Sequence, residues 1–230
     1  MKGDCLVSDT LIIAMPTHDS RAVVQTMLEL MQVGREMGRS VMVVSSEASN
    51  IPRCRNLVLD RIRKYVSPPE RPWVLWVDSD ILIPPDSHRT IVEALTWAET
   101  HERCIAANYM MGNGVPVLMR SRDPEQAYHY TPAELEEMPT YAEVGMAGFG
   151  FVYLRQPLDY LFHADRVGED VHFWWDYPDI RIYWAKQIRL GHKKSVLLMP
   201  EGTGLSPEPP DSSPVSQSNR QSRRAAQRAR

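Results

Sequence analysis

The sequence WVLWVDSD, at residues 73–80, decides the fold. Its first five residues are all apolar, which is typical of a strand that is buried on both faces of a sheet. Asp78 and Asp80 follow directly, and side chains two positions apart on an extended chain point the same way. The stretch therefore predicts a buried strand that brings two carboxylates to one edge of a sheet.

Strand–helix units on both sides of this stretch repeat the pattern. Apolar runs at 11–15 and 41–44 predict strands, and helices are expected after Ser20, from Pro52 and from Pro84. A further strand is expected to begin at Ile105. Short connections between such units favour a parallel sheet with helices on both faces, which binds ligands at the carboxyl ends of its strands.

The pattern changes after residue 112. Segments 115–118 and 144–154 predict strands without a helix between them, and 120–141 predicts a long loop. We expect an α/β domain over 1–200 with a mostly parallel, Rossmann-type central sheet. Its nucleotide-binding half is 11–111, and its acceptor half, 112–200, carries a small antiparallel addition. Residues 201–230 are rich in Ser, Pro and Arg, which predicts a disordered tail.

The composition excludes several classes of protein. The 230 residues are 43% hydrophobic, as in soluble domains, with no apolar run near the length of about 18 that crosses a bilayer and no secretory signal. A cytoplasmic protein is expected. Three widely spaced cysteines predict neither a disulfide framework nor a zinc site. The first strand is followed by 15–19, MPTHD, which lacks the glycines of dinucleotide-binding and Walker-type loops.

Asp78 and Asp80 have two interpretations. Hard carboxylate oxygens suit Mg²⁺ or Mn²⁺, which can bridge the phosphates of a nucleotide. Acidic residues also end strands simply because they favour turns. The very apolar strand that precedes them favours the metal site.

Several short motifs, in this order along residues 11–195, resemble the GT-A fold nucleotide-sugar glycosyltransferases of the Asp-x-Asp type. Residues 12–17 resemble the first strand of that fold, whose end holds the base, and Arg55-Asn56 resembles the helix start before the Asp-x-Asp strand. Residues 145–151 resemble the glycine-containing strand beneath the acceptor sugar. The Glu-Asp element and the distal histidine of the family are matched at 168–170 and 191–192. The small size is similar to that of bacteriophage enzymes, some of which glycosylate modified DNA bases.

The resemblance implies a metal-dependent transfer, with inversion, from a UDP- or GDP-linked sugar to a hydroxyl acceptor, a glycan or a modified DNA base, in the host cytoplasm if the enzyme is phage-encoded. It implies Mn²⁺ or Mg²⁺ as cofactor, held by Asp78, Asp80 and His192. The implied catalytic base is Asp170 or, failing that, Glu169. The implied donor-binding residues are Pro16, Thr17, Asp19, Arg55, Asn56, Asp78 and Ser79, and the acceptor-binding residues are Gly148 and, as an aromatic platform beside acidic residues, Trp174 or Trp175.

Other interpretations of the same residues stay open. Thr17 and Asp19 can cap a helix, and Arg55 can be a solvated helix residue. The acids at 169–170 can oppose a helix dipole, the glycines at 145–150 can mark a bent strand, and His192 can be structural. A nucleotidyltransferase is the nearest alternative enzyme. The five arginines within 220–230 offer another alternative, a module that tethers nucleic acid through its tail.

Overall fold

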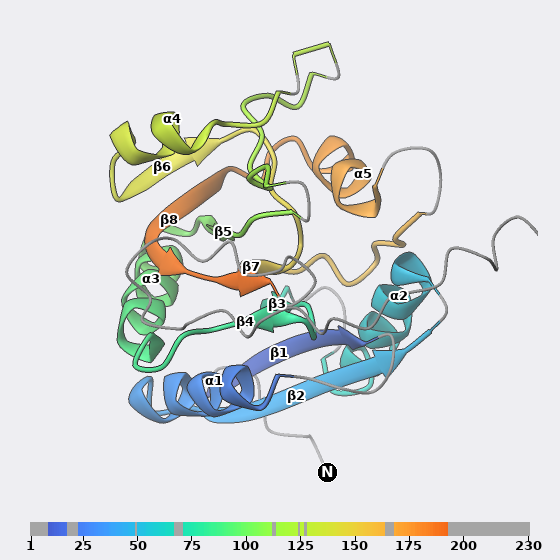
Figure 1. The fold of residues 1–230 in the computed structure, drawn as a ribbon. Helices are drawn as coiled ribbons and strands as arrows, with labels where there is room; N and C mark the ends of the chain where they lie inside the picture. The colour runs from blue at the N-terminus through green and yellow to red at the C-terminus, as the bar shows by residue number, and fades with distance from the viewer. Residues whose placement is uncertain are drawn as a thin grey trace, which may run out of the picture.

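The computed structural model describes residues 9–17, 23–48, 50–66, 71–111, 114–123, 125–126, 128–163 and 168–192. A seven-stranded sheet in the order β2-β1-β3-β7-β5-β8-β6 forms the centre of the molecule (Figure 1). Strands β2, β1, β3, β5 and β8 run in one direction, and β7 and β6 run in the other. The strands are β1 (Thr10–Thr17), β2 (Ser40–Glu47), β3 (Trp73–Val77), β5 (Cys104–Asn108), β6 (Tyr141–Val144), β7 (Phe151–Arg155) and β8 (Ile182–Arg189).

Helices cover both faces of this sheet. The apolar side chains of β1 alternate between two cores: Ile13 packs in one with α1 (Val24–Glu36) and α3 (His88–His101). Ile12 packs in the other with α2 (Ile51–Ile62) and α5 (Glu169–Asp176). Because both faces are buried, the strands at the centre of the sheet must be apolar throughout. The expected α/β architecture is thus confirmed, with a mostly parallel central sheet flanked by helices.

The second half of the chain differs from the expectation in detail. Segment 115–118 forms no regular strand, because Pro116 lacks an N–H and the region makes only isolated bridges. Of the segment 144–154, which was expected to be strand, only the ends are: Val144 is the last residue of β6, β7 begins at Phe151, and 145–150 connects them. The expected loop 120–141 contains α4 (Pro132–Glu137), whose N-terminus has a capping box between Thr131 and Glu134. Strand β8 was not predicted.

Two helices also begin later in the chain than expected. The helix expected from Pro84 begins at His88, after Asp86 adopts a left-handed backbone with φ of 62°. Helix α1 begins at Val24, and the expected cap Ser20 lies outside the described residues. The predicted tail 201–230 also lies outside them. Within the described part of the chain, no helix has the length and apolar character needed to cross a membrane.

A second, two-stranded sheet matters for the site. Strand β4 (Ile81–Leu82) pairs antiparallel with β9 (Gly191–His192), so that Ile81 lies opposite His192. This pairing brings the end of the described chain next to the residues that follow β3. It is the small antiparallel addition, and it positions His192 beside the Asp-x-Asp segment.

Candidate active site

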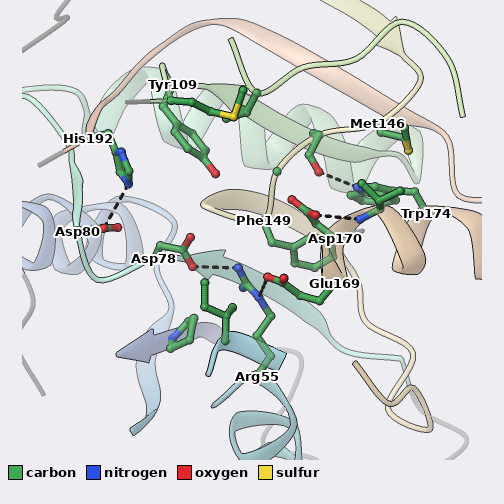
Figure 2. Close-up of a pocket in the computed structure, with 18 of the residues that line it drawn as sticks. Arg55, Asp78, Asp80, Tyr109, Met146, Phe149, Glu169, Asp170, Trp174 and His192 are labelled. Atoms are coloured by element: carbon green, nitrogen blue, oxygen red, sulfur yellow. Dashed lines mark hydrogen bonds and ion pairs between the residues drawn. The ribbon is translucent and has the colours of Figure 1, made fainter. Parts of the chain in front are cut away.

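One pocket of about 410 Å³ opens at the carboxyl ends of the parallel strands. The end of β1, the start of α2 and the segment after β3 line one side of it. The segment after β5, the connection between β6 and β7 and the first turn of α5 line the other. Figure 2 shows the acidic side chains from these separate elements facing one space. The pocket is where a parallel α/β sheet is expected to bind its ligand.

Arg55 is the central cation of the pocket floor. Its side chain, only 2% exposed, places Nη2 3.1 Å from Asp78 Oδ1 and Nε 3.2 Å from Glu169 Oε1 (Figure 2). The guanidinium also lies 5.4 Å from the ring centre of Trp76 and 5.3 Å from that of Phe149. Arg55 therefore joins α2 to the end of β3 and to the start of α5.

The pKa values of Arg55 and Asp78 depend on one another. Burial raises the pKa of Asp78, and Arg55 opposes this shift. Burial alone would lower the pKa of Arg55, but the carboxylates of Asp78 and Glu169 outweigh it, and the pKa is raised. The predicted alternative, a solvated helix residue, is therefore wrong for Arg55, because its guanidinium lies in the interior on two carboxylates.

Asp80 and His192 form a separate pair in the pocket. His192 Nε2 lies 3.2 Å from Asp80 Oδ2, and each side chain is about one-fifth exposed. Asp80 directly precedes β4 and His192 belongs to β9, so the pairing of these two strands brings the side chains together. An imidazole and a carboxylate are ligands that Mn²⁺ accepts.

The fit of this donor set to a metal ion is partial. Over the part of the chain that the structure describes, no three His, Cys, Asp or Glu side chains are grouped closely enough to hold a metal ion by themselves. The Asp78 carboxylate contacts Arg55, whereas the Asp80 carboxylate contacts His192, so the two acids do not share one partner. A cation at Asp80 and His192 would complete its coordination with oxygen atoms from a ligand, as Mg²⁺ commonly does with phosphates.

Asp170 is the titratable group best suited to proton transfer. Burial, with the neighbouring charge of Glu169, raises its pKa to about 6, while Arg55 acts in the opposite direction. Its Oδ1 accepts a hydrogen bond of 2.9 Å from the Val171 amide. A Cβ at Gly148 would lie 3.5 Å from Asp170 Oδ2 and 2.7 Å from Tyr109 Oη. The glycine therefore keeps open the space beside the carboxylate.

The predicted donor-binding residues divide into two groups. Pro16, Thr17 and Ser79 line the pocket together with Arg55 and Asp78, and the Thr17 hydroxyl donates to the Ser46 carbonyl. Asn56 instead binds the backbone of Phe162, with its amide donating to the carbonyl at 3.0 Å and accepting from the N–H at 2.7 Å. Asn56 thus holds a loop, while Asp19 lies outside the described residues.

The two predicted acceptor tryptophans have different surroundings. Trp174 lines the pocket although it is fully buried, and its Nε1 donates to the Ala147 carbonyl at 2.7 Å. Trp175 donates to the Arg122 carbonyl and packs edge-on against His172. The structure thus places Trp174 in the pocket wall and Trp175 against the segment that contains Arg122. That segment is fixed to α5, because Arg122 donates to the carbonyls of Trp174 and Tyr177.

Sequence reasoning missed several residues that line the pocket. These are Ile51, Cys54, Tyr109, Met111, Val117, Met119, His129 and Val171. Tyr109 could have been found, since it follows β5 as Asp78 follows β3. Its hydroxyl accepts from the Gly150 amide, and burial raises its pKa, which keeps it protonated. The methionines carry no sequence signal that separates a pocket wall from a core.

Comparisons with known proteins add a similarity of fold. No protein-family model matches the sequence, and no curated protein matches it. Among solved structures, a similar chain is a glycosyltransferase involved in the glycosylation of the major capsid of PBCV-1. It is 11% identical, with a TM-score of 0.42, over 79% of this chain and 94% of that chain. The similarity is one of backbone arrangement.

Proposed function

We propose that the protein transfers a sugar from a nucleoside-diphosphate-sugar, UDP- or GDP-linked, to a hydroxyl acceptor. The observation that carries this proposal is that one pocket contains two separate acidic sites. Asp78 and Asp80 lie at the carboxyl end of β3, and Asp170, with its pKa of about 6, lies across from them on α5. One site suits an anionic leaving group held through a cation, and the other suits proton removal.

Asp170 is the proposed catalytic base. A pKa of about 6 leaves the carboxylate largely ionised at neutral pH and makes it a stronger base than an ordinary Asp. The space kept open by Gly148 gives a hydroxyl group access to Oδ2. Glu169 is less suited to this role, because its carboxylate is already paired with Arg55.

A divalent cation, Mn²⁺ or Mg²⁺, would be held by Asp80 and His192, with Asp78 as a further candidate ligand. When bound it would neutralise charge on the departing diphosphate. Arg55 favours the ionised form of Asp78, against the effect of burial on its pKa, and orients the carboxylate at the same edge. Pro16, Thr17 and Ser79, at the ends of β1 and β3, would contact the nucleoside part of the donor.

The proposed reaction inverts the anomeric carbon. The acceptor oxygen forms a bond to that carbon as the bond from the carbon to the diphosphate oxygen breaks, and the hydroxyl proton moves to Asp170. Inversion needs one base on the acceptor side. Asp170, which lines the pocket, is that base in this proposal.

The proposal is tested first by donor binding and turnover. A panel of nucleotide-sugars is screened by thermal shift with and without Mn²⁺, and hydrolysis of the stabilising donor is measured. We expect cation-dependent hydrolysis that Asp80→Ala reduces at least about a hundredfold. Asp60→Ala, on the exposed side of α2, is the matched control and leaves the rate unchanged. Full activity of Asp80→Ala would contradict the metal assignment.

The alternative functions give other products. A nucleotidyltransferase would release pyrophosphate from a nucleoside triphosphate and a sugar phosphate. A module that acts through the arginine-rich tail would lose nucleic-acid binding on deletion of 205–230 and be indifferent to Asp80→Ala. Measuring all three readouts on the full chain separates these possibilities.

A further inference from the structure

The segment that contains Asp80 is bound to helix α1 through its backbone. The Val23 amide, at the start of this helix, donates to the Ser79 carbonyl at 3.3 Å. The Thr26 hydroxyl, in the first turn of the helix, donates to the Ile81 carbonyl at 2.6 Å. The carbonyl groups on both sides of Asp80 are therefore held by one helix.

The Thr26 hydroxyl makes a second bond to the same segment. It accepts from the Ile83 amide at 3.1 Å, and Thr26 is only 1% exposed. In an extended chain, the carbonyl of one residue and the amide of the residue two positions later lie on the same edge, where a neighbouring strand would bind them. One buried hydroxyl thus takes the place of a neighbouring strand beside β4, which pairs with β9.

Glu29, one turn further along α1, binds the continuation of this segment. Its carboxylate accepts from the Asp86 amide at 3.2 Å and from the His88 amide at 3.1 Å, and Glu29 is 7% exposed. Positions 23, 26 and 29 are three residues apart, so they lie on one face of the helix. That face fixes the path of the chain from the end of β3 to the start of α3.

The β4-β9 sheet needs this support from outside. Each of its strands has two residues, and even a longer isolated pair of strands is only marginally stable. Ile81 and Ile83 are fully buried, but the hydrophobic effect that favours their burial is non-directional. A hydrogen bond weakens steeply when its angle is distorted, so the bonds of Thr26 fix the position of the backbone more closely than burial does.

The position of β4 determines how Asp80 and His192 meet. His192 Nε2 lies 3.2 Å from Asp80 Oδ2 because Ile81, the residue after Asp80, is paired with His192 across the two strands (Figure 2). A displacement of β4 along or away from β9 would change this distance. Groups that orient metal ligands without touching the metal commonly change its affinity by about 10 to 100-fold.

We propose that Thr26 is a positioning residue for the cation site, which holds Asp80 opposite His192 through the backbone of β4. The inference rests on the proposed function, because it concerns the site at which the cation would bind. Thr26 is not among the residues that line the pocket, so its effect reaches the pocket through the segment 79–83.

Two substitutions of Thr26 in the full chain test this inference. Thr26→Val replaces the hydroxyl with a methyl group of similar size, so the Ile81 carbonyl and the Ile83 amide lose their partner, whereas Thr26→Ser keeps the hydroxyl. Electron paramagnetic resonance measures the binding of Mn²⁺, alone and with UDP or GDP. We expect Thr26→Val to raise the Kd for Mn²⁺ at least about tenfold, and Thr26→Ser to keep it within about twofold of wild type.

Tyr153→Phe is the matched control for the loss of a buried hydroxyl. The Tyr153 hydroxyl donates to Glu99, and this residue lies on β7 and does not line the pocket. Its substitution should leave the Kd for Mn²⁺ unchanged. An equal rise of the Kd in Tyr153→Phe, or in Thr26→Ser, would assign the effect to a general loss of stability and overturn the inference.

Hydrogen exchange provides a readout that needs no cation. Thr26→Val should speed exchange in peptides that cover 79–83 and 191–192 at least about tenfold, and Thr26→Ser should not. If Thr26→Val does not fold, Val23→Pro carries the same two expectations. It removes only the amide that binds Ser79, and the φ of −69° at Val23 suits proline.

Each outcome decides one of the two statements. A wild-type Kd for Mn²⁺ in Thr26→Val, or unchanged hydrogen exchange over 79–83, overturns the inference and leaves the proposed function standing. Donor turnover by a wild-type protein that binds no Mn²⁺ also overturns the inference and leaves sugar transfer standing. Absence of both Mn²⁺ binding and donor turnover overturns the proposed function, and the inference with it.

Discussion

The two sides of the pocket lie at the same sheet edge, but one is lined mainly by charged side chains and the other mainly by apolar ones. The donor side contains a buried cation, Arg55, and the carboxylates of Asp78 and Asp80. The acceptor side, formed by the segment after β5, the connection before β7 and the first turn of α5, contains several methionines and small apolar residues. Under the proposed function, the charged side chains would position the donor and the leaving group, and the apolar side chains would contact the acceptor. Only Asp170 and Glu169 belong to both sides.

The largest effect on catalytic rate is expected from a change at Asp170, where the two sides of the pocket meet. Asp170→Asn keeps the shape of the side chain but removes the proposed base, so kcat for transfer should fall about a thousandfold. Steady-state kinetics with the best donor and acceptor measure this loss. Asp176→Asn, at the other end of α5 and half exposed, is the control and should retain the wild-type rate. Nearly full activity of Asp170→Asn would assign the proton transfer to another group.

The second prediction concerns the contribution of the charged side of the pocket to the free energy of unfolding. Arg55→Met leaves the carboxylates of Asp78 and Glu169 without their buried partner, which should lower the free energy of unfolding by about 3 to 5 kcal/mol. Urea denaturation measures the change. Arg53→Met, an exposed arginine two positions earlier on the same helix, should change it by less than about 0.5 kcal/mol. Equal values for the two variants would show that the buried network does not contribute to stability.

The smallest effect is a shift of the pH profile. Since the base must be ionised, kcat should rise with pH through a midpoint near 6, the pKa of Asp170. The charge of Glu169 contributes to that raised pKa, so Glu169→Gln should move the midpoint to lower pH. The pH dependence of kcat measures the shift, with Glu137→Gln on α4 as the exposed control. A midpoint that moved to higher pH would contradict the electrostatic origin of the raised pKa.

The donor side was the more predictable part of the molecule. Buried strands such as 73–77 are written as continuous apolar runs, and the rule that ligands bind at carboxyl edges then places Asp78 and Asp80. Arg55 was ambiguous, because it stands among other basic residues and its partners lie 23 and 114 positions away in the chain. No local pattern reports such distant pairing.

The acceptor side was hidden for a different reason. The run 115–118 is apolar because Val117 and Leu118 are buried. Residues buried in a pocket wall and residues buried in a strand are both apolar, so the sequence does not distinguish them. Strand β8 mixes buried and half-exposed positions and so lacks a clear period. Met111 and Met119 likewise cannot be told from core residues in the sequence, because only the tertiary fold places them around the pocket.

The position of β7 has a consequence for how the molecule can be divided. This strand, from the second half of the chain, lies between β3 and β5 from the first half and bonds to both (Figure 1). A fragment ending near residue 111 would lack the strand that fills the middle of its own sheet. Separately expressed pieces 1–111 and 112–230 are therefore expected to gain structure only when mixed, so that recombination of this enzyme with relatives must exchange the two segments together.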